Sequence, residues 1–286
     1  MPSRPRSSYM ELPPPVALAP YVTRLWVQRI GDGETAYDQP ILPDGCLDLV
    51  SINGDVVVAG PATRPVTAHL PPGSVTVGVR FRTGAAPPLV GVSAVELRDQ
   101  EIKLSELWGA AGAGTAERDA EASDWVKRLD VLVRSLVGRL DHAPAIDPVA
   151  TSLPMLLAER PGESLRRLAD EVALSERQLR RRVEVAVGYS PRTLARIPRF
   201  QRFLRAARRS SRGRRDLAGL AAEIGYADQA HLTRESRQLA GLPPGAFLDQ
   251  ETQRLGQPNS DPAVDSARLR GGSIAHSEGG GIDGDL

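Results

Sequence analysis

The residues whose types and spacing suggest chemistry are arginines at helical spacing in the second half of the chain. Three of them share one face of an expected helix: Arg177, Arg180 and Arg181. A guanidinium group is planar and donates two parallel hydrogen bonds, which fits the O6 and N7 acceptors of guanine in the DNA major groove. Apolar residues on the opposite face would anchor the helix: Leu179, Val183 and Val187. The pattern indicates a base-reading helix, and its alternative is a basic face that meets only solvent.

A second group of residues with groove-reading chemistry follows further along the chain and consists of Gln229, Ala230, Thr233 and Arg234. Glutamine pairs with N6 and N7 of adenine, and threonine contacts the methyl group of thymine. Only one residue of this group is charged, whereas the first group has three arginines. We therefore expect the first group to supply more of the electrostatic attraction to DNA.

Two helix-turn-helix units are expected to position these groups, over Ser164–Val187 and Asp216–Leu239. In each unit apolar residues repeat at i, i+3, i+4 and i+7, the spacing of one helical face. Ser175 begins a Ser-Glu-Arg-Gln capping box, which starts the second helix of the first unit. Asp216 and Asp228 are the expected N-caps of the second unit. Two such units in one domain can place two helices in successive major grooves.

An arginine-rich helix is expected between the two units, with Ser190 as its N-cap and a proline at its first position. Its arginines recur along the helix: Arg192, Arg196, Arg199, Arg202 and Arg205. Arg199 is predicted to contact the DNA backbone, so that Arg199→Ala should reduce the salt dependence of binding. Pro198 removes one helical hydrogen bond, and we expect a kink or a restart there.

Basic residues are concentrated in this part of the sequence. The whole chain has a net charge of +1, but residues 160–249 contain 19 Arg against 10 Asp and Glu, a net charge of +9. The remainder of the chain therefore carries a net charge of −8. Such asymmetry favours a polyanionic partner for the basic part, and double-stranded DNA is the expected one.

The first half of the sequence indicates strands. Short apolar runs separated by turn residues cover Tyr21–Ile30, Cys46–Ile52, Val56–Ala59 and Val75–Phe81. Asn53-Gly54 between two of these runs predicts a β-hairpin. Beyond them, Glu121–Leu140 has the periodicity of an amphipathic helix, which serves either packing or dimerisation. The expected fold class is α+β, with a β-rich N-terminal domain and flanking helices followed by an all-α domain with two helix-turn-helix units.

Composition divides the chain into five segments. They are a flexible, proline-rich N-terminus (1–20), a β-rich domain expected to bind an effector (21–110), a linker with an amphipathic helix (111–148), the double helix-turn-helix domain (149–249) and a tail (250–286). The tail is rich in Gly, Ser, Asp and Gln, so it is expected to be disordered.

Composition also narrows the function classes. Hydrophobic content is 41% and charged content 25%, as in globular proteins, and the apolar runs are too short and too often interrupted by charge for a membrane span. The N-terminus lacks the continuous apolar region of a secretion signal, so we expect a cytoplasmic protein without a membrane partner. One cysteine, four histidines and no phosphate-binding glycine loop argue against catalysis, a metal site or a cofactor.

Several residues of the N-terminal part have two interpretations each. Cys46 is either a redox sensor or a buried, inert residue, and a lone cysteine in an apolar run is more often the latter. Arg80 and Arg82 share one face of a strand, where they either meet an anionic effector or form structural ion pairs. Asp44 and Asp48 have the spacing of a carboxylate pair, but backbone bonding in a Pro-Asp-Gly turn is enough to explain Asp44.

The second half of the chain, over residues 150–248, resembles the DNA-binding domain of AraC/XylS-type transcription regulators. The resemblance rests on four segments: Gly188–Pro191, Arg199–Arg202, Ile224–Glu235 and Gly241–Phe247. It implies two helix-turn-helix units, joined by a long helix, that read adjacent major grooves on one face of the DNA. By position, the base-reading residues of the family fall on the two groups described above. The chain departs from the family pattern at Val183 and Ser236, where the family has aromatic residues, and we expect a reduced core there.

The first half resembles a β-rich domain that precedes some AraC-type units. The segments that carry this resemblance are Leu42–Leu49, Gly60-Pro61, Gly78–Ala85 and Leu104–Gly109. It implies a sensory role for this domain. Two alternatives stay open: a small-molecule-binding or enzymatic N-terminal module with an accessory DNA-binding domain, and a constitutive DNA-binding protein whose N-terminal domain is structural. Besides DNA, the partners left open are RNA polymerase, a small-molecule effector and a second copy of the chain.

Overall fold

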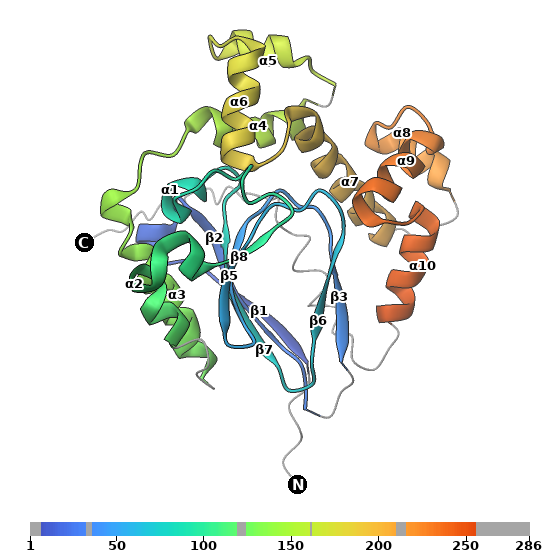
Figure 1. The fold of residues 1–286 in the computed structure, drawn as a ribbon. Coiled ribbons are helices and arrows are strands. Elements are labelled where there is room, and N and C mark those ends of the chain that lie inside the picture. The colour runs from blue at the N-terminus through green and yellow to red at the C-terminus, as the bar shows by residue number, and fades with distance from the viewer. Residues whose placement is uncertain (1–6, 33–35, 119–123, 161, 210–215, 256–286) are drawn as a thin grey trace, which may run out of the picture.

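The computed structural model describes residues 7–32, 36–118, 124–160, 162–209 and 216–255. In these residues the chain folds into a β-rich N-terminal domain and a helical C-terminal domain (Figure 1), each with its own cluster of buried apolar side chains. The α+β fold class predicted from the sequence is confirmed. None of the described helices is long and apolar enough to cross a membrane.

The strands of the described residues belong to the N-terminal domain. They are β1 (Ser8–Leu12), β2 (Val22–Arg29), β3 (Tyr37–Ile41), β4 (Asp48–Ile52), β5 (Asp55–Ala59), β6 (Val66–Leu70), β7 (Val75–Phe81) and β8 (Glu101–Lys103). One antiparallel sheet has the order β1-β2-β7-β4-β5-β8, and β3 pairs separately with β6. The predicted hairpin joins β4 to β5, with Asn53 and Gly54 at φ values of 51° and 84°. Both values lie in the left-handed region that a two-residue hairpin turn requires.

The N-terminal segment differs from the flexible stretch expected over residues 1–20. Strand β1 pairs with β2, and Tyr9 stacks on Trp26 with ring centroids 6.4 Å apart. Leu18 lies in a 3-10 helix (Val16–Leu18) and is fully buried. Local composition does not reveal this order because the stabilising partners come from the neighbouring strand. Residues 1–6 lie outside the described residues.

Three helices flank the sheet: α1 (Pro87–Val90), α2 (Leu104–Arg118, broken at Gly109) and α3 (Trp125–Val137). Helix α3 is the amphipathic helix expected within Glu121–Leu140, and its apolar face belongs to the N-terminal core. Arg128 holds it to the sheet by donating to the carbonyl oxygens of Ser51 (2.6 Å) and Val75 (2.8 Å). Side chains of both α2 and α3 belong to the N-terminal core, whereas the sequence predicted a linker over residues 111–148.

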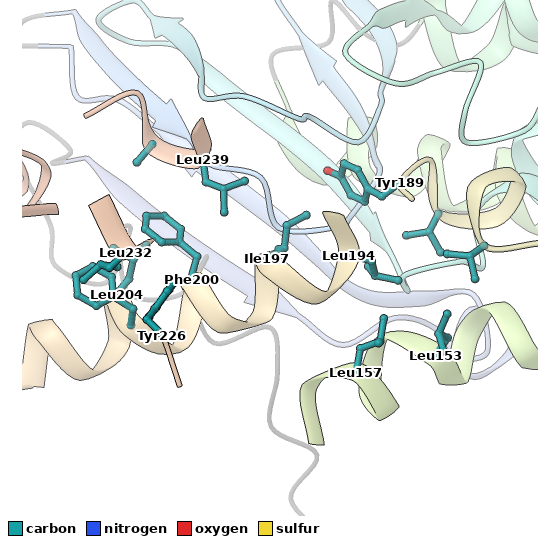
Figure 2. Close-up of a cluster of buried hydrophobic side chains, with 14 of the residues drawn as sticks. Leu153, Leu157, Tyr189, Leu194, Ile197, Phe200, Leu204, Tyr226, Leu232 and Leu239 are labelled. Atoms are coloured by element: carbon teal, nitrogen blue, oxygen red, sulfur yellow. The ribbon is translucent and has the colours of Figure 1, made fainter. Parts of the chain in front are cut away.

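The helical domain consists of α4 (Pro148–Glu159), α5 (Leu165–Glu171), α6 (Glu176–Val187), α7 (Pro191–Arg209), α8 (Leu217–Ile224), α9 (Gln229–Ala240) and α10 (Pro244–Leu255). Figure 2 shows part of its core, where Phe200 and Leu204 of α7 lie beside Tyr226 and Leu232. Helix α7 runs through Pro198 without a restart. Helix α10 extends to Leu255, so the ordered domain continues past the predicted boundary at residue 249. The rest of the predicted tail, residues 256–286, lies outside the described residues.

Candidate nucleic-acid interface

Helix α6 presents the first predicted group to solvent. The Ser175 hydroxyl accepts from the Gln178 N–H (3.3 Å), and the Gln178 side chain accepts from the Ser175 N–H (2.9 Å), so the predicted capping box is present. The anchoring residues are fully buried: Leu179, Val183 and Val187. The exposed ones include Arg177, Arg180 and Arg181. Arg182 is directed elsewhere, with its Nε atom 3.8 Å from a carboxylate oxygen of Asp147 at the start of α4.

Helix α9 exposes three of the four residues of the second predicted group. The predicted N-caps, Asp216 of α8 and Asp228 of α9, both accept backbone hydrogen bonds with their side chains. Three members of the group are exposed: Gln229, Ala230 and Arg234. Thr233 is half-buried, and its hydroxyl donates to the Gln229 carbonyl at 2.9 Å. This bond engages the hydroxyl within the helix and leaves the methyl group as the part of Thr233 suited to a base contact.

Arg199, predicted to contact the DNA backbone, is engaged inside the domain. Its guanidinium donates to Glu235 at 2.6 and 3.2 Å and lies 4.7 Å from the centre of the Tyr226 ring. Arg196 donates to the same carboxylate at 3.0 Å, and the Tyr226 hydroxyl at 2.8 Å. The Glu235 side chain is only 2% exposed. One buried carboxylate on α9 therefore binds both α7 and the turn that follows α8.

The charges in this cluster reinforce one another. Burial lowers the pKa of Arg199, but the hydrogen bonds and negative charge of Glu235 outweigh it, so the pKa is raised above its ordinary value. Burial, followed by the charge of Glu235, raises the pKa of Tyr226. The arginine therefore stays charged, and the tyrosine hydroxyl stays protonated and able to donate.

Other exposed arginines extend the two reading faces. Arg237 is exposed on α9, one helical turn after Thr233, and its i+4 spacing was a sequence signal that the prediction did not use. Arg166 and Arg167 are exposed on α5, where Arg167 pairs with Glu163 at 3.4 Å. Arg166 and Arg167 thus add exposed positive charge to the first helix-turn-helix unit, and Arg237 adds it to the second.

The predicted departure at Ser236 has a specific structural consequence. Ser236 is fully buried, and its hydroxyl donates to the Leu242 carbonyl at 2.7 Å. A hydrogen bond between α9 and the loop that follows it thus occupies the position where the family has an aromatic ring.

The polar groups of the N-terminal domain favour the structural interpretations. Arg80 is buried and pairs with Asp48 (2.8 Å) and Asp44 (3.1 Å), and Arg82 donates to a backbone carbonyl. Burial, followed by the negative charge of Asp44, raises the pKa of the Cys46 thiol to about 12. The reactive thiolate is therefore scarce at neutral pH. In the part of the chain that the structure describes, no three side chains among His, Cys, Asp and Glu form a group able to hold a metal ion.

Solved structures similar to this chain include ToxT from Vibrio cholerae O395, with a TM-score of 0.40 and 9% identity over 75% of this chain and 94% of ToxT. A second is wild-type ToxT from Vibrio cholerae strain SCE256 with a bound unsaturated fatty acid. It has a TM-score of 0.38 and 11% identity over 87% of this chain and 97% of that one. No curated protein shows significant sequence similarity to this chain.

Two protein families match separate parts of the sequence. Residues 10–103 match a domain of unknown function (DUF6597), which covers most of the β-rich domain. Residues 168–250 match a helix-turn-helix domain family (HTH_18), which spans α6 to α9 and therefore both exposed reading faces. The chain thus carries an AraC-type helix-turn-helix domain at the C-terminal side of a β-rich N-terminal domain.

Proposed function

We propose that this chain binds specific DNA sequences with α6 and α9 in two successive major grooves and thereby controls transcription. The observation that carries the proposal is the open face of α6, from which Arg177, Arg180 and Arg181 project while the other face is buried. A capped and anchored helix holds these side chains in fixed register. Each well-placed arginine–guanine pair contributes roughly 1–3 kcal/mol of discrimination against other bases.

Helix α9 supplies the second reading face in this proposal. Gln229 and Arg234 offer hydrogen-bond donors, and Ala230 and Thr233 offer apolar contacts suited to thymine. Glu235 neutralises Arg199, so we assign Arg199 to the positioning of α9 against α7 rather than to a DNA phosphate. The two helices should therefore contribute unequally to affinity, with α6 dominant.

The N-terminal domain has a modulating part in the proposal. Hydrogen bonds from Ala94 and Arg98 to the end of α6 support this part, because they connect the β-rich domain to a reading helix. No catalytic step is included, because exposed arginines suffice for recognition of a polyanion.

The proposal is tested by enriching duplexes from a randomised DNA pool with the full-length chain. We expect a motif with two half-sites whose centres lie about 10–10.5 base pairs apart, one of them rich in guanine. The triple variant Arg177→Ala, Arg180→Ala, Arg181→Ala should enrich no motif, because it lacks the base-reading groups of α6. All three side chains are exposed, so their loss leaves the core intact. Failure of the wild-type chain to enrich any motif would contradict the proposal.

A further inference from the structure

The C-terminal end of α6 contacts the N-terminal domain directly. The last carbonyl groups of a helix have no partner within the helix and need one elsewhere. At the end of α6, the Ala94 N–H donates to the Val185 carbonyl at 2.8 Å, and the Arg98 guanidinium donates to the Gly188 carbonyl at 3.3 Å. Both donors belong to the turns that precede β8. The N-terminal domain therefore supplies hydrogen-bond partners for the end of this reading helix.

Tyr189, the residue after this helix end, is bonded to two loops of the N-terminal domain. Its hydroxyl donates to the Ala62 carbonyl at 2.6 Å and accepts from the Gly45 N–H. The residue is 1% exposed, and its burial raises the pKa of its hydroxyl well above the ordinary value. Leaving a buried hydroxyl without partners is costly, so these bonds favour a permanent contact between the domains. In Figure 2, Tyr189 lies near Leu194, at the start of α7.

The backbone at this junction also approaches the N-terminal domain closely. Gly188 has a φ of 81°, and an added Cβ there would lie 2.4 Å from the Pro61 side chain and 2.8 Å from the Ala94 carbonyl oxygen. Only glycine satisfies both the left-handed conformation and this proximity. The end of α6 is thus fitted to the surface of the β-rich domain.

Helix α9 is held in a different way. Its buried Glu235 forms ion pairs with Arg196 and Arg199 of α7, whereas the end of the helix meets the N-terminal domain by van der Waals approach, an added Cβ on Gly241 lying 3.3 Å from the Pro65 side chain. Figure 1 shows the same arrangement, with α6 above the loops at one end of the sheet and α9 beyond α7. The two reading helices therefore depend on different parts of the molecule.

We infer that the N-terminal domain positions α6, with Arg98 and Tyr189 as positioning residues, so that the half-site read by α6 depends on this domain. The half-site read by α9 does not. The inference rests on the proposed DNA binding. A shift of the loops around Gly45, Ala62 or Ala94 then reaches α6 directly and α9 only through α7.

The test compares the full-length chain with the double variant Arg98→Met/Tyr189→Phe, which removes the two side-chain donors at the end of α6 and nearly keeps the side-chain volumes. The probe is the duplex enriched by the wild-type chain, examined by hydroxyl-radical footprinting. The half-site read by α6 is identified as the one that Arg181→Ala weakens. In the double variant we expect the affinity for this half-site to fall roughly tenfold and the affinity for the other half-site to stay unchanged. Equal loss on both half-sites, or no loss on either, overturns the inference.

Matched controls remove the same groups within the N-terminal domain alone. Arg82→Met removes a guanidinium that donates to the Ala19 carbonyl (2.7 Å), and Tyr9→Phe removes a hydroxyl that donates to Glu11 (3.0 Å). Both controls should give the wild-type footprint. A control variant that weakens the α6 half-site as strongly as the double variant contradicts a specific role for Arg98 and Tyr189.

Hydrogen exchange on the free protein provides a readout that needs no DNA. In the double variant, the amides of residues 184–189 should exchange roughly tenfold faster, while those of α9 keep their wild-type rates and show that the domain is folded. If the wild-type chain enriches no duplex, the proposed function fails, and hydrogen exchange alone decides the inference. Unchanged exchange at residues 184–189 then overturns it.

Discussion

Three arginines of the basic half have different surroundings, and we expect them to differ in function for that reason. Arg181 is exposed on the open face of α6, Arg182 on the same helix is directed to Asp147, and Arg199 is bound to the buried Glu235. A guanidinium that already donates to a carboxylate has few donors left for a base or a phosphate. Net charge alone therefore overstates the number of arginines that are available to DNA.

Arg181→Ala should weaken specific binding by about 1–3 kcal/mol and non-specific binding much less, because it removes a donor aimed at a base edge. Arg182→Ala is the matched control, since it removes the same charge one residue further along the same helix. We expect it to leave the ratio of specific to non-specific affinity unchanged. Titration of the enriched duplex and of a scrambled duplex measures both affinities. A proportional loss on both duplexes by Arg181→Ala would assign this residue to phosphate.

At the scale of elements, Glu235 is the residue that fixes α9 against α7. It accepts hydrogen bonds from Arg196, Arg199 and Tyr226, all within a largely buried cluster. Removing the negative charge of Glu235 leaves two arginines without their counter-ion. The free energy lost in this way exceeds the net stabilisation that the ion pair contributes. The side chains of Arg196 and Arg199 are 25% and 20% exposed, so solvent relieves part of this cost.

Glu235→Gln should therefore destabilise the helical domain by about 2–3 kcal/mol, somewhat less than the loss of a partner from a fully buried pair. The salt dependence of DNA binding should stay unchanged, because we assign Arg199 to the positioning of α9 rather than to a DNA phosphate. Urea unfolding and affinity measurements at several salt concentrations test the two statements. Glu171→Gln is the control: it breaks an exposed pair with Arg160 (2.8 Å) and should cost below about 1 kcal/mol. Equal losses in the two variants would show that the cluster does not hold α9.

Sequence reasoning predicted the features that depend on near neighbours in the chain. The Ser175 capping box, the Asp216 and Asp228 caps and the Asn53-Gly54 hairpin all involve residues within a few positions of one another. The role of Arg199 was not predictable in this way, because Glu235 is distant in sequence. Strand β1 was missed for the same reason, since its order depends on β2.

For the whole molecule, contacts between the two domains add to the two separate cores. The end of α6 is completed by N-terminal loops, and Leu42 of the β-rich domain packs against the helical core. Gln201 of α7 also donates to the Pro43 carbonyl at 3.2 Å. The N-terminal domain thus completes the end of α6 and also contacts α7, the helix that follows it.

Helix α10, the last described helix, is held to α7 by an ion pair. Glu251 of α10 is buried and binds Arg208 of α7, with Arg208 Nε 2.8 Å from the carboxylate. Truncation after Leu255 should leave both DNA affinity and melting temperature unchanged. Truncation after Asp249 removes Glu251 and half of α10, and should lower the melting temperature by roughly 5 °C. Glu251→Gln in the full chain separates loss of the ion pair from loss of the helix. Weaker DNA binding after removal of residues 256–286 alone would show that these residues contribute to the interface.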